Sequence, residues 1–285
     1  MDHHTLAHRD PMTAVIVYQG EPGAYSDEAA QRLFPTSSTR GLATFQEVFA
    51  EIDGNRARAA VLPVENSLAG VVQEVSDLLW RYSHLTAVAE YVAPIKHHLL
   101  GRGGTPVIRA LSHPQALAQC ARWLRQHEVT PVAFHDTAGA AREVAEHGVP
   151  GDGAIASRMA AERYGLLVLE SDLADDASNR TRFLVIEQGQ GASSVLSGVA
   201  KFSLGFVAEH RPGGLARVLE VFASNGMNLT RLDSRPIPHQ PFHYRFYADV
   251  ELLDAAQYSS LIQELSQVTS ELRPFGIYPP GQLTA

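Results

Sequence analysis

The chain has 285 residues, 45% of them hydrophobic, and a formal net charge of −8. This length allows about two domains, each with a sizeable core. The negative charge argues against nucleic acid as a partner, and an anionic substrate would need a local cluster of positive side chains.

The single cysteine, Cys120, rules out an intrachain disulfide, so a reducing cytoplasm is the expected compartment. Its helical surroundings predict a small buried residue and not a nucleophile. No stretch approaches the roughly 20 apolar residues of a membrane span, so no membrane partner is expected. Residues 1–11 lack the apolar core of a signal peptide. We expect them to form a frayed tail. The three histidines and two aspartates there form no carboxylate or cysteine cluster, so no metal site is expected.

In chain order, a short strand at 15–18 precedes a glycine- and proline-containing turn at 20–25 and a helix. Ser26 is the expected N-cap, with Asp27 and Glu28 in the first turn. Such a junction offers backbone N–H groups to an anion. Neither a dinucleotide fingerprint nor a phosphate loop is present, so no nucleotide cofactor is expected.

A second strand at 59–64 ends at Glu65, Asn66 and Ser67, and a helical pattern follows from Val71 to Trp80. Ligands bind at the carboxyl ends of strands in open α/β sheets, so these three polar side chains suit substrate contact. They equally suit a capped turn, which is the simpler interpretation of these residues alone.

The middle of the chain alternates short strands and helices, which is typical of parallel α/β sheets. Expected caps are Ser112 or His113, then Asp136–Thr137, then Ser157. His113 is also considered as an acid–base group, with capping or packing preferred. The expected strands are 85–100 with a break at Pro94, 108–111, 132–134, 154–156 and 166–169, and the expected helices are 115–126, 138–146 and 158–164.

Asn179-Arg180-Thr181-Arg182-Phe183 leads into an apolar run at 184–186, which predicts a buried strand whose first residues line a pocket. Arg182 can hold a carboxylate in a bidentate fork. Thr181 carries a hydroxyl that can donate to a departing oxygen, and Phe183 can exclude water. The alternative is an edge strand whose Thr and Arg are solvated.

After a glycine- and serine-rich connector at 189–198, the pattern reads β-α-β-β-α-β, the ferredoxin-like order. This segment has too few acid–base residues to be the catalytic part. Its expected elements are strand 201–208, helix 214–224, strand 229–236, strand 243–252, helix 255–269 and strand 273–278.

Together these motifs resemble a prephenate dehydratase with a C-terminal ACT regulatory domain, from about Val15 to Pro280. In the regulatory part, Gly214 stands where the family has Ala, and Asp233 stands where it has Glu. The residues that carry the resemblance are Gly20 to Ser26, Pro63 to Ser67, Ser112 to Cys120, Asn179 to Phe183, Gly213 to Leu215 and Asp233 to Pro236.

The resemblance implies a two-lobe α/β catalytic domain, similar to type II periplasmic binding proteins with a cleft between the lobes, and a ferredoxin-like α+β ACT domain. The implied boundaries are 13–190 for the catalytic domain, with lobe 1 at about 13–94 and 181–190 and lobe 2 at about 95–180. The implied ACT domain is 199–280.

The implied reaction converts prephenate to phenylpyruvate, CO2 and water in phenylalanine biosynthesis. Thr181 is the implied catalytic residue. The histidines lack metal spacing and Lys96 and Lys201 lie in strand or linker patterns, so neither a metal nor a pyridoxal cofactor is expected. Arogenate dehydratase and a non-catalytic amino-acid sensor are the alternatives. The implied substrate-binding residues are Ser26, Glu65, Asn66, Ser67, Ser112, His113, Gln115, Gln119, Thr137, Asn179, Arg182 and Phe183.

The resemblance also implies allosteric inhibition by L-phenylalanine at the ACT domain. A ferredoxin-like module has exposed sheet edges and one bare face, and pairing would cover them, so a homodimer or homotetramer is expected. The implied phenylalanine-binding residues are Gly213, Gly214, Leu215, Asn228, Leu229, Asp233, Ser234, Arg235 and Pro236.

Overall fold

The structure is a computed structural model that describes residues 15–189 and 198–281. The chain divides into two compact units. Unit 1 comprises the described residues up to Val61 together with Pro94–Asn179. Unit 2 comprises Leu62–Ala93 and the described residues from Arg180 onward.

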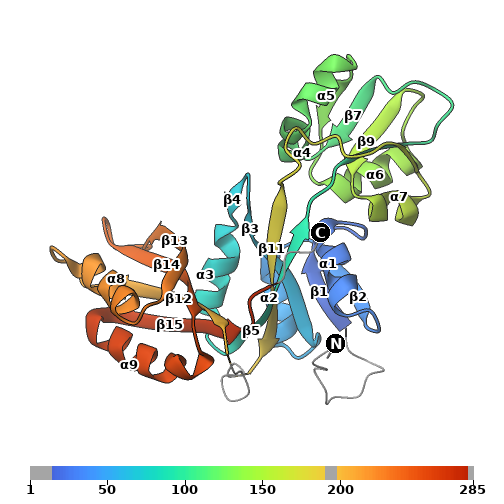
Figure 1. Cartoon of the computed structure of the whole chain (residues 1–285). Helices are drawn as coiled ribbons and strands as arrows, with labels where there is room; N and C mark the ends of the chain where they lie inside the picture. Colours follow the sequence, from blue (N-terminus) through green and yellow to red (C-terminus); the bar gives the residue numbers. More distant parts are fainter. Residues whose placement is uncertain (1–14, 190–197, 282–285) are drawn as a thin grey trace. The chain divides into compact units, whose positions relative to one another are not determined.

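Unit 1 contains most of the short alternating strands and helices (Figure 1). Its elements are β1 (Val15–Gln19), α1 (Tyr25–Leu33), β2 (Ser38–Leu42), α2 (Phe45–Asp53), the start of β3 (Ala59–Asn66), β6 (His98–Gly101), β7 (Arg109–Ser112), α4 (Pro114–Gln119), α5 (Ala121–Gln126), β8 (Thr130–Ala133), α6 (Thr137–Glu146), β9 (Asp152–Ala156), α7 (Arg158–Tyr164) and β10 (Leu167–Glu170).

The five-stranded sheet of unit 1 has the order β10-β6-β9-β7-β8. Strand β7 is parallel to β8 and β9, as predicted, but β6 is antiparallel to both β9 and β10. The sheet is therefore mixed: the predicted parallel pairing holds at β7, and the pairing of β6 differs from it. Small residues of α6 and α7 pack on this sheet, including Ala140, Ala141 and Ala160, and let the helices approach closely.

Helix α1 begins at Tyr25 with Ala24 as N-cap, and no side chain caps it. The prediction that Ser26 caps this helix was wrong, because Ser26 already lies in the first turn. Asp27 takes a related role: its carboxylate accepts the N–H of Gly23 at 2.9 Å and the hydroxyl of Thr39 at 2.8 Å. The turn before α1 is thus fixed by the first helical turn.

Unit 2 contains the end of β3, a short hairpin and helix, two long strands and the C-terminal module (residues 198–281). Its elements are β4 (Gly70–Val71), α3 (Gln73–Arg81), β5 (Leu85–Pro94), β11 (Arg180–Gln188), β12 (Ala200–Ala208), α8 (Gly214–Ser224), β13 (Asn228–Pro236), β14 (Tyr244–Leu252), a 3-10 turn (Ala255–Gln257), α9 (Tyr258–Val268) and β15 (Thr269–Tyr278).

The six-stranded sheet has the order β2-β1-β3-β11-β5, with β4 paired to β3. Strand β3 is apolar up to Val64 and buried there except at Pro63, which is partly buried, and its polar residues Glu65 and Asn66 are the last two of the strand. Strand β11 is buried from Thr181 to Ile186, as the apolar run predicted. These two strand ends supply the central part of the site described below.

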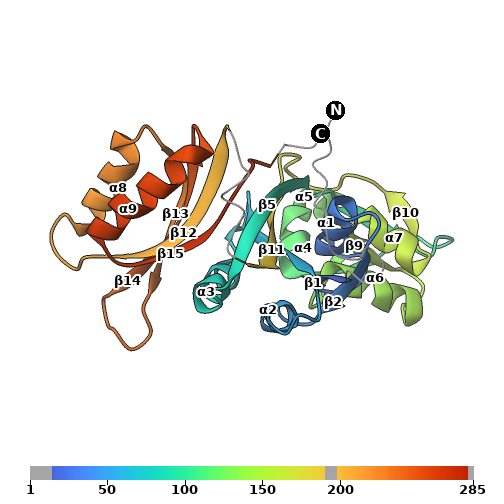
Figure 2. The same cartoon turned by 90° about the horizontal axis from the view of Figure 1, so that it is seen from below.

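The C-terminal module has the predicted β-α-β-β-α-β order, with an antiparallel sheet of order β13-β14-β12-β15. Helices α8 and α9 lie side by side on one face of this sheet (Figures 1 and 2). Its core includes Phe202, Phe206, Phe222, Leu261 and Leu265.

The opposite face of the C-terminal module is not bare, contrary to the expectation. Trp80 of α3 lies against this face, with its ring centroid 6.5 Å from that of Tyr247 and 3.9 Å from the guanidinium carbon of Arg245. The side chain of Thr86 on β5 donates to the carbonyl of Phe275 at 3.1 Å. Covering this face therefore does not require a second copy of the chain.

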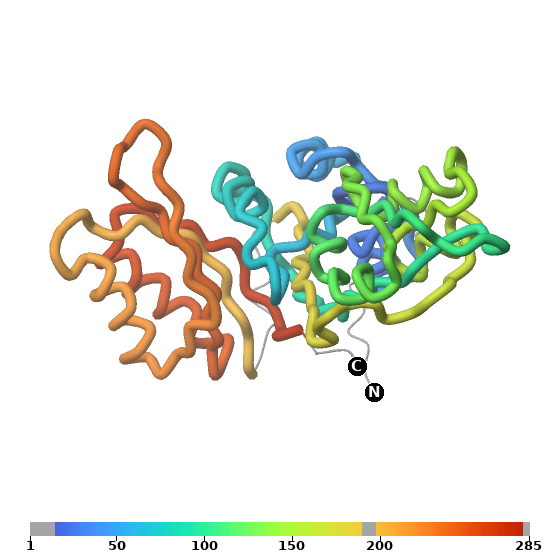
Figure 3. Tube along the Cα trace, turned by 90° about the horizontal axis from the view of Figure 1, so that it is seen from above, coloured from blue at the N-terminus to red at the C-terminus, as the bar shows by residue number. Residues whose placement is uncertain are grey.

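The β13–β14 hairpin loop extends beyond the remainder of the C-terminal sheet (Figures 2 and 3). It carries Phe242, which is 81% exposed. Among the described helices, none is both long and apolar enough to span a bilayer. The predicted N-terminal tail and most of the predicted connector at 189–198 lie outside the described residues.

Candidate active site

Thr181 and Asn66 meet where β11 begins and β3 ends. Asn66 Nδ2 donates to Thr181 Oγ1 at 3.0 Å and to the carbonyl of Arg180 at 3.1 Å. The Thr181 oxygen is therefore an acceptor toward Asn66, and no acceptor for its own proton is recorded among the described residues. Thr181 is 9% exposed. This arrangement leaves an oriented hydroxyl with a proton to donate.

The turn between β3 and β4 holds Asn66 in this position. Its Oδ1 accepts the backbone N–H groups of Leu68 and Ala69 at 3.1 and 2.9 Å. Ser67 pairs with Arg180 in both directions: Ser67 N–H donates to the Arg180 carbonyl and Arg180 N–H donates to Ser67 Oγ, each at 2.9 Å. The interpretation as a capped turn is confirmed for Asn66, which holds the turn through its oxygen and contacts Thr181 through its nitrogen, while substrate contact stays a prediction.

Phe183 is buried and stacks on Tyr91 of β5, with ring centroids 6.4 Å apart. Since side chains alternate along a strand, Phe183 and Thr181 face the same side of β11 and Arg182 faces the other. Phe183 thus supplies an apolar ring on the side of the strand that carries the hydroxyl.

In unit 1, Gln119 is the centre of a chain of partly buried hydrogen bonds. Its Oε1 accepts from Asn179 Nδ2 at 3.0 Å and lies 2.8 Å from His97 Nε2. Because the amide oxygen is only an acceptor, His97 carries its proton on Nε2. The Tyr25 hydroxyl lies 2.8 Å from His97 Nδ1 and 2.8 Å from the Lys96 carbonyl oxygen, and its one proton is shared between these two acceptors. The Gln119 amide is thereby turned so that its nitrogen is available as a donor.

His97 was not predicted as a site residue, because no motif surrounds it in the sequence. It is 2% exposed, and burial lowers its pKa, although the hydrogen bond to Gln119 opposes this shift. Burial also raises the pKa of Tyr25, with the neighbouring Glu28 adding to the shift. Both groups are therefore neutral near pH 7, which is the state that the hydrogen-bond chain requires.

Replacing His97 by Phe is expected to raise KM for the substrate about tenfold, because Gln119 loses a donor and its amide is no longer fixed. His98→Phe is the matched control, since His98 is similarly buried but bonds to the backbone of Asp172. Steady-state kinetics on both variants test the prediction. Equal KM values for His97→Phe and wild type would assign His97 to packing alone.

The remaining predicted residues of unit 1 have mainly structural contacts. Ser112 is fully buried and donates to the Ile155 carbonyl at 2.6 Å, so its hydroxyl ties β7 to β9. His113 caps α4 by accepting the N–H of Gln115 at 3.2 Å, as one of the two expected caps. Thr137 begins α6, which Asp136 caps. Ser26 is 8% exposed in the first turn of α1.

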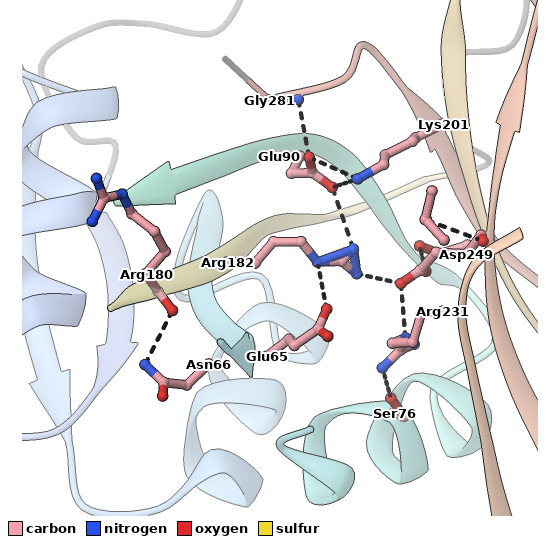
Figure 4. A network of polar contacts seen from close by, with 12 residues as sticks. Glu65, Asn66, Ser76, Glu90, Arg180, Arg182, Lys201, Arg231, Asp249 and Gly281 are labelled. Carbon is pink, nitrogen blue, oxygen red and sulfur yellow. Dashed lines mark hydrogen bonds and ion pairs between the residues drawn. The ribbon is translucent and has the colours of Figure 1, made fainter. Parts of the chain in front are cut away.

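Arg182 lies in different surroundings from those expected for a substrate anchor (Figure 4). Its Nη2 is 2.5 Å from Oδ2 of Asp249 on β14, and its Nη1 is 3.3 Å from Oε2 of Glu90 on β5. Glu65 is a third carboxylate neighbour, 3.7 Å from Nε. The Arg182 side chain is 9% exposed and its guanidinium is surrounded by carboxylates, so it does not present an open fork to a substrate carboxylate.

The cluster around Arg182 extends into the C-terminal module. Lys201 Nζ lies 3.1 Å from Glu90 Oε2, and Arg231 Nε lies 2.7 Å from Asp249 Oδ2. Burial alone would raise the pKa of Asp249, but Arg182 and Arg231 outweigh it and hold this pKa below its usual range. The buried carboxylate of Asp249 is thus kept charged by its two arginine neighbours.

Asp249→Asn is expected to lower the free energy of unfolding by about 3 kcal/mol at pH 7, because it leaves buried cations short of a partner. The pKa of Asp249 in the folded protein lies below the unfolded value of about 3.9. The ionised Asp249 therefore makes its full contribution to the free energy of unfolding above about pH 3.9. This contribution is lost as the pH falls through the pKa of the folded state. Urea unfolding should therefore show a gap between wild type and variant that is constant from pH 7 to 5 and narrows below about pH 4. A gap that stays constant down to pH 3 would contradict this assignment.

Among the described residues, one group could offer three ligand atoms to a metal ion: Glu21, His135 and Asp136. These atoms already have other partners. Glu21 pairs with Arg142 at 3.1 Å, His135 with Asp136 at 2.9 Å, and Asp136 caps α6. The arrangement is explained by these contacts without a metal.

The predicted regulatory residues fall in two places within the C-terminal module. Gly213 adopts a left-handed φ of 77° as N-cap of α8, and a Cβ at Gly214 would lie 2.0 Å from the Glu209 carbonyl. At position 214, where the family has Ala, this chain therefore has no room for a methyl group and carries Gly. Leu215 borders a groove of about 470 Å³ whose other walls include Pro212, Phe242 and Phe246.

The second regulatory segment, Asp233 to Pro236, lies on β13 and contacts α3. Arg235 donates to Asp77 at 2.7 Å, and Gln73 donates to Asp233 at 3.5 Å. Neither Asp233 nor Arg235 lines the groove beside Leu215. A single chain therefore does not bring the two regulatory segments together.

Comparison with known proteins agrees with these features. The family model described as prephenate dehydratase matches residues 16–191, and the model described as ACT domain matches residues 202–269. Arogenate dehydratase/prephenate dehydratase 2, chloroplastic, of Arabidopsis thaliana is 36% identical over 280 residues, which cover 93% of this chain and 72% of that protein.

Two solved structures are similar over almost the whole chain. One is a prephenate dehydratase from Arthrobacter aurescens in complex with L-Phe, with 26% identity and a TM-score of 0.84 over 95% of this chain and 93% of that one. The other, GqqA, is described as a novel type of quorum quenching acylase, with 34% identity and a TM-score of 0.86 over 94% of this chain and 98% of that one. The resemblance inferred from the motifs is confirmed: the chain belongs to the prephenate dehydratase family of lyases and carries a C-terminal ACT domain.

Proposed function

We propose that the substrate is prephenate, which the enzyme converts to phenylpyruvate, and that Thr181 is the proton donor to the departing hydroxyl. The observation that carries this proposal is the hydrogen bond from Asn66 Nδ2 to Thr181 Oγ1 at 3.0 Å. Since Asn66 can only donate through this nitrogen, it fixes the Thr181 oxygen as acceptor and points the hydroxyl proton elsewhere.

The reaction has a simple electron balance. The bond between the ring and its carboxylate breaks, CO2 leaves, and the electron pair enters the ring. The bond between the opposite ring carbon and its hydroxyl breaks at the same time, so the ring becomes aromatic. The hydroxyl takes a proton and leaves as water. Aromatisation provides the driving force, and the barrier lies in expelling hydroxide, a poor leaving group.

Thr181 lowers this barrier as a positioned donor. Its intrinsic acidity is poor, so it acts by donating a hydrogen bond to the developing charge and passing the proton as the C–O bond breaks. The Thr181 oxygen then takes a proton from solvent, so each turnover consumes one solvent proton. A preorganised donor of this kind contributes about 2.7–4 kcal/mol to the transition state. Phe183 and Tyr91 provide apolar surface on the same side of β11, and a less polar environment favours carboxylate loss as CO2. The Gln119 amide, fixed by His97 and Asn179, is proposed as a further donor to the substrate.

Arogenate remains the alternative substrate, because it differs from prephenate only at the side chain and relatives of this chain are named arogenate dehydratases. The test is incubation of the purified protein with each compound, with detection of phenylpyruvate from prephenate and of phenylalanine from arogenate. We expect turnover of prephenate. Turnover of arogenate alone would reverse the substrate assignment, and binding without product would favour the amino-acid sensor.

Hydrolysis of an acylated substrate is the possibility that the similarity to GqqA raises. Cys120, the single cysteine, is not suited to act as the nucleophile of such a hydrolysis, because burial raises the pKa of its thiol to about 12. Thr181 has no general base among its recorded partners. The same two features are compatible with a donor role in dehydration.

We further propose that L-phenylalanine inhibits the enzyme through the ACT domain. The groove beside Leu215 has aromatic and aliphatic walls that suit a benzyl side chain, and the N-terminus of α8 attracts a carboxylate. Strand β13 is an edge of the ACT sheet and carries Asp233 to Pro236. Pairing of two ACT domains would let β13 of one copy complete the groove of another, which supports a homodimer or homotetramer. Cytoplasm is the proposed compartment, on the ground of the single cysteine.

A further inference from the structure

The ion-pair cluster of Arg182, Asp249, Glu90, Arg231 and Lys201 joins the strand that carries Thr181 to the ACT domain (Figure 4). We propose that this cluster transmits the ligand-bound or ligand-free state of the ACT domain to Thr181. The position of the Asp249 carboxylate then decides where Arg182 is held. The inference rests on the proposed dehydratase activity and its inhibition by phenylalanine, and assigns the route of that inhibition.

Asp249 is held by three strands of the ACT sheet at once. It lies on β14, Ser203 of β12 donates to its Oδ1, and Arg231 of β13 contacts its Oδ2 at 2.7 Å. Arg182 contacts the same Oδ2. A displacement of β12 or β13 relative to β14 therefore changes the position or the sharing of the carboxylate that holds Arg182.

Strand β13 has a built-in site for such a displacement. Its pairing with β14 shifts register between Leu229 and Arg231, so an extra residue bulges from the strand directly before Arg231. A bulge bends a strand locally and interrupts its regular pairing. The segment Asp233 to Pro236, which the family resemblance assigns to phenylalanine, follows on the same strand. A ligand that displaces this segment also displaces Arg231, because only two peptide bonds separate Arg231 from Asp233.

Arg182 has a second partner within reach. Its Nε lies 3.7 Å from Glu65 Oε2, which is too long for a hydrogen bond, and this Nε has no hydrogen-bond partner in the described residues. The guanidinium is buried, and without Asp249 it would keep only Glu90, at 3.3 Å from Nη1, so loss of Asp249 favours a turn toward Glu65. Two discrete arrangements follow, one with Arg182 held by Asp249 and one with Arg182 turned to Glu65.

A change between these two arrangements can shift Thr181, because both Arg182 and Glu65 are close to it along the chain. Arg182 is its peptide neighbour on β11, and Glu65 is the peptide neighbour of Asn66, which orients the Thr181 hydroxyl. A misplacement of a catalytic group by about 1 Å can cost about 100-fold in rate. The cluster can therefore inhibit the reaction without contacting the substrate, which makes Arg182 a positioning residue.

The test uses the full chain with Asp249→Asn, which removes the charge that ties Arg182 to the ACT domain. Phenylalanine binding is measured by calorimetry, and inhibition is measured as the ratio of dehydratase activity without phenylalanine to activity at saturating phenylalanine. We expect binding to persist and the ratio to fall about fivefold or more toward one. The ratio is taken within each variant, so a changed basal rate does not enter it.

Glu264→Gln is the matched control, because it removes one carboxylate from the ACT domain at a position that contacts Asn225 and not the cluster. It should keep the wild-type ratio. Should Asp249→Asn fail to fold by circular dichroism, Ser203→Ala decides the question, since it removes a hydroxyl bonded to Asp249 without changing charge. It is expected to lower the ratio in the same direction.

Unchanged inhibition in a folded Asp249→Asn variant that binds phenylalanine, or in Ser203→Ala, would overturn the inference and leave the proposed function standing. A wild-type enzyme that turns over prephenate but is indifferent to phenylalanine would instead overturn the proposed regulation, and this route with it. The two failures are therefore distinguishable.

Discussion

Thr181→Ala is expected to lower kcat roughly 100- to 1,000-fold while leaving KM within about threefold of wild type. The hydroxyl acts on charge that develops only as the C–O bond breaks, so its loss affects the transition state and not substrate binding. Steady-state kinetics with prephenate give both constants.

Two variants control this result. Thr181→Ser keeps a hydroxyl within reach of Asn66 and should recover most of kcat. Thr86→Ala removes a hydroxyl of almost equal burial, 8% against 9%, that donates to the Phe275 carbonyl and has no part in catalysis. Near-wild-type kcat in Thr181→Ala, or an equal loss in Thr86→Ala, would remove Thr181 from the mechanism.

Asn66→Asp is expected to have the second largest effect, a loss of kcat of about 100-fold. The carboxylate still accepts the N–H groups of Leu68 and Ala69, so the turn is preserved. It can no longer donate to Thr181 Oγ1 and instead accepts the hydroxyl proton. The proton that should reach the leaving group is then withdrawn, and a lost preorganised donor of this kind costs about 100-fold or more.

Asn225→Asp tests whether a generic change of amide to carboxylate explains such a loss, since Asn225 lies in the ACT domain and bonds to Val221 and Glu264. It should leave kcat unchanged. The double variant Thr181→Ala, Asn66→Asp should be little worse than Thr181→Ala alone, because the two side chains act as one unit. Additive losses would mean that Asn66 serves another purpose.

The helices, strands and caps that depend on neighbouring residues could be predicted from the sequence. The strand at 180–188, the caps at Asp136 and Ser157 and the β-α-β-β-α-β order of the ACT domain all follow from hydrophobic periodicity and capping residues, and each is present. Helix α2 was missed although its signal was visible, because Thr44 and Glu47 form a capping box. The pairing of Thr181 with Asn66 could be anticipated only through the family motifs.

Features that depend on long-range packing were not predictable. The sequence places Arg182 beside Thr181 but cannot show that Asp249, 67 positions later, neutralises it. His97 has no local motif and acquires its role from Gln119 and Tyr25, which are 22 and 72 positions away. The antiparallel direction of β6 likewise depends on its partners and not on its residues. The boundaries of the two predicted lobes stay a prediction.

The most direct test of the proposed mechanism is a single-turnover measurement with enzyme in excess over prephenate, comparing wild type, Thr181→Ser and Thr181→Ala. Saturating enzyme separates the chemical step from binding and product release. We expect phenylpyruvate to form at similar rates with wild type and Thr181→Ser, and roughly 100- to 1,000-fold more slowly with Thr181→Ala while prephenate stays bound. Formation of phenylpyruvate by Thr181→Ala at the wild-type rate would contradict the assignment of Thr181 as proton donor.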